Sequence, residues 1–203
     1  MINFLKTEEQ HQHKNGGGWV ANTATVSETA YVGPNAWVSG NARVSDNARV
    51  YDNARVSGNA WVSGDAWVSG DARVSGNALV SGNARVSGNA RVYNTAQVYG
   101  NARVYGNAQV YGSAWVSGNA QVYGSAWVSG NALVSGNALV YGIMRSDGYC
   151  FVYVPCADGK KRVIVGCRYF TMPEALRHWK KTRGGTALGR ETMKILAALK
   201  SLY

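Results

Sequence analysis

The sequence predicts an all-β fold, a single-stranded parallel β-helix, followed by a small module with two helices. Three observations support this prediction: a six-residue repeat without interruption from Gly18 to Val140, alternation of inward and outward residue types inside each repeat, and loss of the period after Gly142. We expect three segments: an N-terminal cap or flexible segment (1–17), the hexapeptide-repeat β-helix (18–143) and a basic C-terminal ββαα module (144–203).

Each repeat is one short strand and one corner. The repeats share the pattern Ala-x-Val, in which Val is constant over twenty-one hexads and Ala is replaced once, by Gly18. Alternate residues of a strand face the same side, so Ala and Val point inward and the residue between them faces solvent. Two residues after Val stands Gly or a residue type that tolerates positive φ. These replacements are Asn22, Asp46, Asp52 and Asn94, while Glu28 and Pro34 break the rule in the first coils.

Three hexads form one triangular coil, so the repeats predict seven coils. A strand spacing of about 4.8 Å makes the prism roughly 34 Å long. Burial of one Val is worth about 1.5–3 kcal/mol relative to exposure. One coil alone does not offset its ordering entropy, whereas stacked coils share a continuous core.

The positive charge is concentrated at the C-terminal end. The net charge is +10, of which residues 144–203 contribute +8 and the repeats +2. An acidic partner is therefore expected mainly at that end. The three cysteines are an odd number, and the chain shows neither a secretion signal nor an apolar run of membrane-spanning length. These features predict a cytoplasmic location and no membrane partner.

The hexad Ala-x-Val-Ser/Tyr-Gly-Asn resembles the left-handed β-helix of the bacterial hexapeptide-repeat proteins, which include acyltransferases and γ-class carbonic anhydrases. The resemblance covers residues 18–143 and implies a left-handed coil. Those acyltransferases typically use a histidine base near an extruded loop, and the anhydrases use three histidines around a metal. Residues 18–143 contain no histidine, no cysteine and no insertion. We therefore predict a protein without catalytic residues or cofactor, with a divergent acyltransferase as an alternative.

The outward residues of every third hexad form a row on each flat face. These rows carry all the arginines of the repeats and six of the seven tryptophans, and exposed aromatic surface usually marks a contact. Three interpretations stay open: a homo-oligomer, for which the resemblance favours a trimer; packing of Arg on Trp of the next coil; or a nucleic-acid or nucleotide surface. The candidate ligand-binding residues are Arg55, Arg73 and Arg91 on one face and Arg49, Trp67, Arg85 and Arg103 on another.

The C-terminal segment predicts a hairpin and two helices. Residues 149–155 alternate like a strand, 157–160 indicate a turn and 162–167 a return strand. A capping box, Thr171-Met-Pro-Glu174, begins a helix that ends near Lys181, and an amphipathic helix runs from about Gly189 or Arg190 to Leu202. The module is expected to cap the open end of the β-helix. Its further candidate phosphate ligands are Lys160, Lys161 and Arg162 at the hairpin and Lys180, Lys181 and Arg183 after the first helix.

No metal site is predicted. The residue types that would ligate zinc, Cys150, Cys156, Cys167 and His178, lack a Cys-x-x-Cys pair. Alternation instead places Cys150 and Cys156 on one face of the hairpin.

The run Gly166-Cys-Arg-Tyr-Phe-Thr, with Glu174-Ala175 and His178-Trp179, is similar to a C-terminal module of uncharacterised phage and prophage proteins. The resemblance implies a phage origin and, with it, the host cytoplasm. We hypothesise a non-enzymatic, oligomeric β-helix scaffold that engages an anionic partner: nucleic acid, a nucleotide or a host protein. By analogy with other phage proteins it would inhibit a host defence. A structural spacer or assembly module is the alternative.

Overall fold

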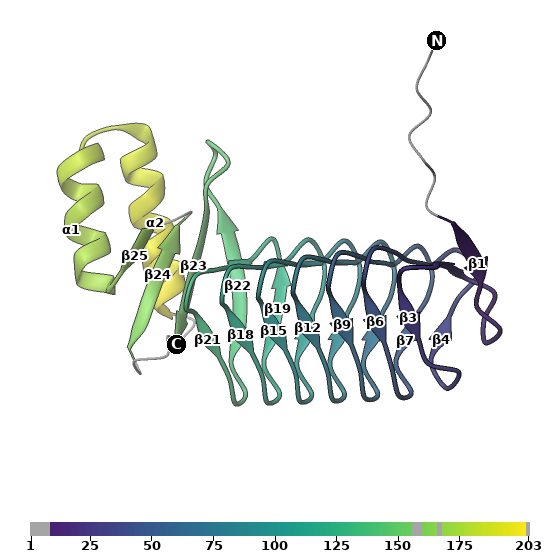
Figure 1. Cartoon of the computed structure of the whole chain (residues 1–203). Helices are drawn as coiled ribbons and strands as arrows, with labels where there is room; N and C mark the ends of the chain where they lie inside the picture. Colours follow the sequence, from purple (N-terminus) through teal and green to yellow (C-terminus); the bar gives the residue numbers. More distant parts are fainter. Residues whose placement is uncertain (1–8, 156–159, 166–167, 202–203) are drawn as a thin grey trace, which may run out of the picture.

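The computed structural model describes residues 9–155, 160–165 and 168–201. A three-sided β-helix makes up most of the molecule, and a module of strands and two helices lies at its C-terminal end (Figure 1). The predicted parallel β-helix is thereby confirmed.

Three parallel sheets form the faces of the β-helix, and we name them A, B and C. Sheet A contains β2 (Trp19–Ala21), β5 (Trp37–Val38), β8 (Arg55–Val56), β11 (Arg73–Val74), β14 (Arg91–Val92), β17 (Gln109–Val110) and β20 (Trp127–Val128). Sheet B contains β3 (Thr25–Val26), β6 (Arg43–Val44), β9 (Trp61–Val62), β12 (Leu79–Val80), β15 (Gln97–Val98), β18 (Trp115–Val116) and β21 (Leu133–Val134). Sheet C contains β4 (Tyr31–Val32), β7 (Arg49–Val50), β10 (Trp67–Val68), β13 (Arg85–Val86), β16 (Arg103–Val104), β19 (Gln121–Gly124) and β22 (Leu139–Met144).

The strand register follows the hexads. Each strand pairs with the strands one coil before and after it, so Arg73 lies between Arg55 and Arg91. The three sheets carry the repeat strands in equal number, and the predicted seven coils are confirmed.

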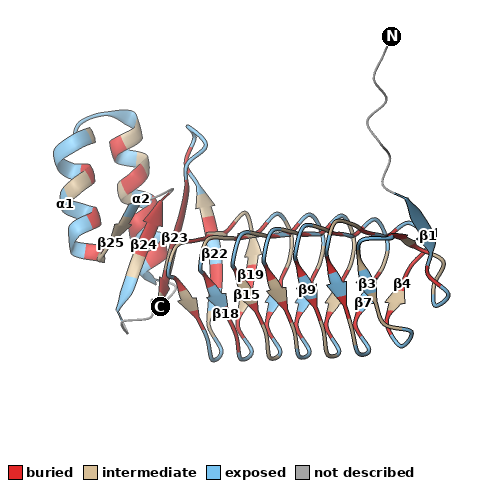
Figure 2. Cartoon of the chain, viewed as in Figure 1, coloured by how far each residue is buried: buried red, intermediate tan, exposed pale blue. Residues whose placement is uncertain are grey.

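The interior is filled by the Ala and Val of the pattern. From Ala30 to Val134 each of these residues is at most 1% exposed. The residue between them lies outside the core and is exposed or half-buried, so the faces alternate as the repeat predicted (Figure 2). A core of such small side chains leaves room only for a narrow prism.

The corners need positive φ, as predicted. The corner glycines from Gly40 to Gly136 have φ between 62° and 73°, and Asp46, Asp52 and Asn94 have φ of 59°, 56° and 60°. The prediction is wrong for Asn22, which does not adopt positive φ. Its backbone N–H donates to the carbonyl of Glu9 at 2.8 Å, so this corner is held by the N-terminal segment instead.

A ladder of side-chain amides runs along the corners, at the position just before Ala. Asn101 Nδ2 donates to Asn119 Oδ1 at 3.0 Å, and Asn119 donates in turn to Asn137 at 3.0 Å. Equivalent bonds between asparagines of successive coils have lengths of 3.0–3.4 Å. The sequence signal for this ladder is the recurrence of Asn just before Ala in most hexads, and we assigned no role to that position from the sequence.

The N-terminal segment covers two edges of the first coil. Strand β1 (Gln10–Gln12) pairs antiparallel with β2, so it closes sheet A at this end. The backbone N–H of Val32 donates to Asn15 and its carbonyl accepts from Gly18, which engages the edge of sheet C. Residues 10–18 therefore act as a cap, because unpaired strand edges would otherwise invite association.

Sheet C continues into the C-terminal module without a break. Strands β23 (Cys150–Pro155), β24 (Lys161–Val165) and β25 (Arg168–Phe170) add to β22 as antiparallel neighbours. The predicted ββαα unit is thus incomplete, because the module also contains the strand β25. With three residues, β25 is too short for its sequence to indicate a strand. The predicted boundary after residue 143 falls inside β22, since Gly142 continues the strand and forms no corner.

Strand β23 separates two hydrophobic cores. The core of the β-helix includes Val152 and Val154 of β23 and Ile164 of β24. Strand β23 also contacts β20 and β21. The alternate residues Phe151 and Val163 pack against the helices. This layer therefore caps the β-helix with one face and supports the helices with the other, as the capping prediction required.

Two helices, α1 (Met172–Arg183) and α2 (Ala187–Ser201), cover the outer face of this layer. Thr171 and Glu174 form the predicted capping box, with the Thr171 backbone N–H donating to the Glu174 carboxylate at 2.8 Å. Helix α2 begins before the predicted Gly189, because the Thr186 hydroxyl accepts a hydrogen bond from the Gly189 N–H at 3.0 Å. Residues 157–159 of the turn predicted at 157–160 lie outside the described residues, as do Cys156, Cys167 and Leu202.

Candidate functional site

Sheet A carries an uninterrupted row of three arginines. Arg55, Arg73 and Arg91 lie on adjacent strands and are exposed. Neighbouring strands are about 4.8 Å apart, so these like charges are close. Within the described part of the chain, no carboxylate forms an ion pair with any of them.

Sheet C carries a second arginine row that is built around a tryptophan. The Arg49 and Arg85 guanidinium carbons lie 5.4 Å and 4.6 Å from the centroid of the Trp67 ring. Arg49 and Arg85 belong to the strands on either side of Trp67, and Arg103 follows Arg85 on the next strand. The interpretation that Arg packs on Trp of the neighbouring coil therefore applies at this place.

A groove of about 810 Å³ lies over the first half of sheet C. Arg49, Trp67 and Arg85 are part of its lining, beside Tyr31 and Tyr51. The Trp67 ring is flanked by two guanidinium groups and meets Tyr51 edge-on at 6.1 Å. A nucleic-acid base would have to displace an arginine to stack on Trp67, so the groove offers guanidinium groups more readily than aromatic faces. The other lining residues are Asn15, Thr29, Asn47, Asp65 and Asn83.

The acidic residues of these coils lie at the corners and bind the backbone or the amide ladder. Carboxylates of Asp46 and Asp52 accept from the N–H groups of the next corners, at 2.9 Å and 3.0 Å. Asp65 and Asp71 accept from asparagine amides at 3.2 Å and 3.1 Å. These hydrogen bonds stabilise the stack of corners, and none of these four carboxylates forms an ion pair with an arginine of the described rows.

The change from Arg to Gln along the faces accompanies a change from Ser to Tyr after Val. Tyr93 donates from its hydroxyl to Gln109 of the next coil at 3.2 Å, and Tyr105 does the same to Gln121. The tyrosine rings also stack, with Tyr93 and Tyr111 at 4.9 Å and an interplanar angle of 4°. Partial burial raises the pKa of the Tyr93 hydroxyl, with Tyr111 as a second cause. The arginine rows therefore end where this aromatic ladder begins.

Sheet B is the least charged of the three faces. Its outward row has one arginine, Arg43, and contains the most exposed tryptophans, Trp61 at 47% and Trp115 at 44%. A shallow apolar depression of about 370 Å³ lies beside Trp115 and Leu133. This face has the composition of a protein–protein contact.

The two predicted basic clusters of the module lie near opposite ends of α1. Arg162 is close enough to Glu174, in the first turn, to lower the pKa of that carboxyl, although hydrogen bonds from Thr171 are the main cause. Lys180, Lys181 and Arg183 occupy the last turn. Arg183 lies nine helical steps after Glu174, roughly 13 Å at 1.5 Å per residue. The structure therefore does not bring Lys160, Lys161 and Arg162 together with the second cluster.

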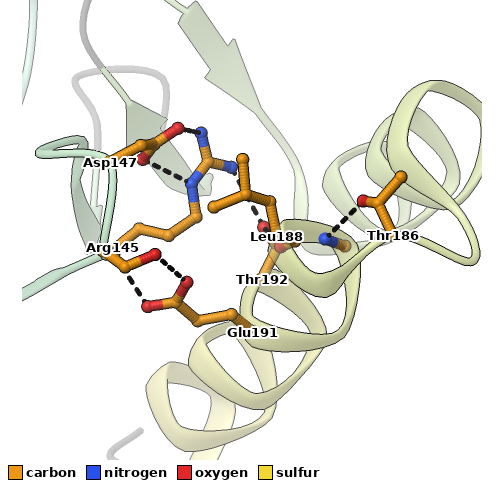
Figure 3. A network of polar contacts seen from close by, with 8 residues as sticks. Arg145, Asp147, Thr186, Leu188, Glu191 and Thr192 are labelled. Atoms are coloured by element: carbon orange, nitrogen blue, oxygen red, sulfur yellow. Dashed lines mark hydrogen bonds and ion pairs between the residues drawn. The ribbon is translucent and has the colours of Figure 1, made fainter.

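A polar network joins the turn after β22 to α2 (Figure 3). Arg145, which is 4% exposed, donates to both carboxylate oxygens of Asp147, at 2.8 Å and 2.7 Å, and to Thr192 at 3.0 Å. Ser146 donates from its backbone and its hydroxyl to Glu191, at 2.8 Å and 2.6 Å. The Arg145 hydrogen bond holds the pKa of Asp147 below its usual range. Sequence reasoning missed this network, because its partners are more than forty residues apart.

Among the described residues, no group of three His, Cys, Asp or Glu side chains is placed to hold a metal ion. Neither α1 nor α2 has the length and apolar character of a membrane-spanning helix.

Burial raises the pKa of the Cys150 thiol to about 11. Its sulfur donates to the Ser125 carbonyl at 3.0 Å, so Cys150 has a structural environment at the junction of β-helix and module.

Comparison with known proteins identifies the repeat. The family model described as the YdcK beta solenoid repeat matches in successive overlapping or adjoining copies that span 36–112 and 114–142, just over half of the chain. The individual matches are residues 36–52, 48–64, 54–70, 66–82, 72–86, 84–95, 96–112, 114–130 and 126–142. No curated protein and no solved structure matches the chain.

Proposed function

We propose that this chain, which belongs to the YdcK beta solenoid repeat family, is a non-enzymatic binding protein whose arginine rows engage a polyanion such as single-stranded nucleic acid. The observation that carries the proposal is the alignment of Arg55, Arg73 and Arg91 on adjacent strands, where no carboxylate of the described residues forms an ion pair with them. The row on sheet C, Arg49, Arg85 and Arg103, supports it.

Electrostatics explains why such rows favour an anionic partner. Two unit charges about 4.8 Å apart in water repel by about 0.9 kcal/mol, and each added arginine increases this cost. A chain of phosphates along the row converts repulsion into attraction and releases bound counterions. Guanidinium groups also match the geometry of phosphate oxygens.

Binding of a labelled single-stranded oligonucleotide, measured by fluorescence anisotropy at several salt concentrations, tests the proposal. We expect a plot of log K against log salt with a negative slope of about 0.7 per phosphate contact. The triple variant R55Q/R73Q/R91Q should bind more weakly and lose about 2 units of that slope.

A charge-matched control separates the row from the net charge. The triple variant R177Q/K194Q/K200Q removes the same number of positive charges from exposed positions on α1 and α2. It should retain most of the affinity and nearly the full slope. Absence of binding by the native protein, or equal losses in both triple variants, would contradict the proposal.

We also propose that the protein is a homo-oligomer, a trimer in the simplest case, in which sheet B forms the contact between copies. Support comes from the single arginine of this row and from the exposed Trp61 and Trp115. The arginine rows of sheets A and C would stay accessible in such an assembly. Light scattering should report an oligomer for the native protein and a monomer for W61E/W115E, whereas R55E on sheet A should leave the assembly intact. A native monomer would contradict this proposal and also the spacer hypothesis.

The proposal extends to a phage-encoded protein that acts in the host cytoplasm and binds a nucleotide or a host protein. Its support is the likeness of residues 166–179 to phage and prophage modules. Mass spectrometry of the native protein purified from its own host would identify a retained nucleotide or protein, and a bare chain would argue against both.

A further inference from the structure

A hollow of about 660 Å³ lies in the C-terminal module, far along the chain from the arginine rows. It is lined by the turn after β22, the strands β24 and β25, and the second half of α1. Three of the lining residues are arginines, Arg145, Arg168 and Arg183, and none of the lining residues that the structure describes is Asp or Glu. Small-molecule sites have volumes of about 300–1,000 Å³, so this hollow has the size of a ligand site.

Arg145 forms a fixed part of the wall. Its guanidinium donates three hydrogen bonds to Asp147 and Thr192, and its carbon lies 5.3 Å and 5.2 Å from the ring centroids of Tyr149 and Phe151. Because Asp147 neutralises this charge, Arg145 contributes rigidity more than attraction for a ligand.

Arg168 and Arg183 supply positive charge and form no ion pair among the described residues. Arg168 donates to His178 Nε2 at 2.8 Å, which orients the guanidinium and occupies one of its five N–H donors. Arg183 is half-buried at the end of α1, and its side chain has no hydrogen bond or ion pair among the described residues. Its charge reaches Asp147, where it is one of the causes of the lowered pKa.

Aromatic rings form the rest of the wall. The His178 ring stacks on Phe170 at 4.9 Å and meets Trp179 edge-on at 5.0 Å. Trp179 is 4% exposed and packs against Phe151, while Tyr149 is 52% exposed at the rim. The hollow thus combines cationic side chains with an apolar side, and hydrogen bonds from Arg145 and Ser146 attach the turn that forms part of its wall to α2.

We propose that this hollow binds a phosphate-bearing small molecule, with the phosphate held by Arg168 and Arg183 and the remainder of the ligand against Tyr149. Two guanidinium groups can donate hydrogen bonds to the oxygens of one tetrahedral phosphate from different directions. The site is separate from the arginine rows, so the proposal of phosphate binding here is tested independently of polyanion binding along the β-helix.

Calorimetric titration of the full chain with pyrophosphate, and with inorganic phosphate as the smaller probe, tests the site. We expect saturable binding with one site per chain and tighter binding of pyrophosphate. Hydrogen bonds to charged groups are worth enough that R168Q or R183Q should each weaken binding about 10-fold to 100-fold. The variant Y149A, which lacks the Tyr149 ring, should bind a phosphate ester that carries a ring, such as phenyl phosphate, more weakly than the native chain does. Its affinity for inorganic phosphate should be unchanged.

Two controls make the result specific. R177Q removes the same charge from the same helix at a residue outside the hollow, and it should bind pyrophosphate like the native chain. R55Q/R73Q/R91Q should also bind it unchanged, although that variant loses polyanion binding. The proposal is overturned if neither probe binds at millimolar concentration, if R168Q and R183Q bind normally, or if R177Q loses as much affinity as they do. Circular dichroism and thermal melting confirm that each variant is folded.

Discussion

The β-helix and the C-terminal module share one continuous sheet but are stabilised by different kinds of contact. In the β-helix every strand, corner and amide ladder joins residues one coil apart. In the module the decisive contacts join unrelated positions, such as Arg145 with Thr192 and Phe151 with Trp179. A repeat array tolerates a local fault because neighbouring coils supply similar contacts, whereas each contact of the module is made once.

The largest expected effect is at the junction of the module's layers. Phe151 of β23 is fully buried and packs against the helices. The variant F151A should lower the free energy of unfolding by about 3–5 kcal/mol. Hydrogen exchange should show lost protection in α1 and α2 but not in the middle coils. L176A, at an exposed position of α1, should change stability by less than about 0.5 kcal/mol. Equal loss of protection in the β-helix would show that the two regions unfold as one unit.

The next largest effect is expected in the pH dependence of the free energy of unfolding, through the Cys150 thiol. Its thiol pKa is raised to about 11 from a usual value of 9.0, so the folded state holds the proton more tightly than the unfolded state. The resulting stability is fully present below about pH 9 and is lost as the pH rises to about 11, by roughly 2–3 kcal/mol. Denaturant titrations across this range should show the loss in the native chain, and C150A should show a shallower dependence. Identical pH profiles for the native chain and C150A would show that ionisation of the thiol does not affect the free energy of unfolding.

Corner glycines distinguish backbone strain from contact between coils. Gly82 has φ of 68°, and a Cβ there would lie 3.1 Å from the Gly100 nitrogen, whereas Gly136 has φ of 64° and open space. Each Ala substitution has a cost of about 1–2 kcal/mol for the left-handed conformation. G82A should cost more than G136A in a thermal melt, because only Gly82 faces another coil. Equal costs would mean that φ alone selects glycine.

The smallest effect is expected in the amide ladder. N101A removes the donor to Asn119 and the acceptor for Asn83, both at the surface, and should cost about 0.5–1.5 kcal/mol. N131A is the matched substitution, because Asn131 also stands just before Ala, is exposed and has no side-chain hydrogen bond among the described residues. A shift in melting temperature for N101A no larger than that of N131A would show that the ladder does not contribute to stability.

The sequence by itself determined the β-helix, its seven coils, its buried Ala and Val and the outward position of the arginine rows. This was possible because a period of six residues repeats every structural constraint, so each hexad tests the same prediction. It also located the helices of the module, since a capping box and an amphipathic period are local signals.

Only the tertiary structure decided how these parts meet. The third strand β25, the two-sided layer that separates the cores and the hollow between Arg168 and Arg183 all depend on contacts between segments without a common period. The same holds for the separation of Lys160 from Lys180 and for the arginines that flank Trp67. Side-chain geometry, and not residue spacing, sets these distances, because chains of the same pattern can pack their ends in many ways.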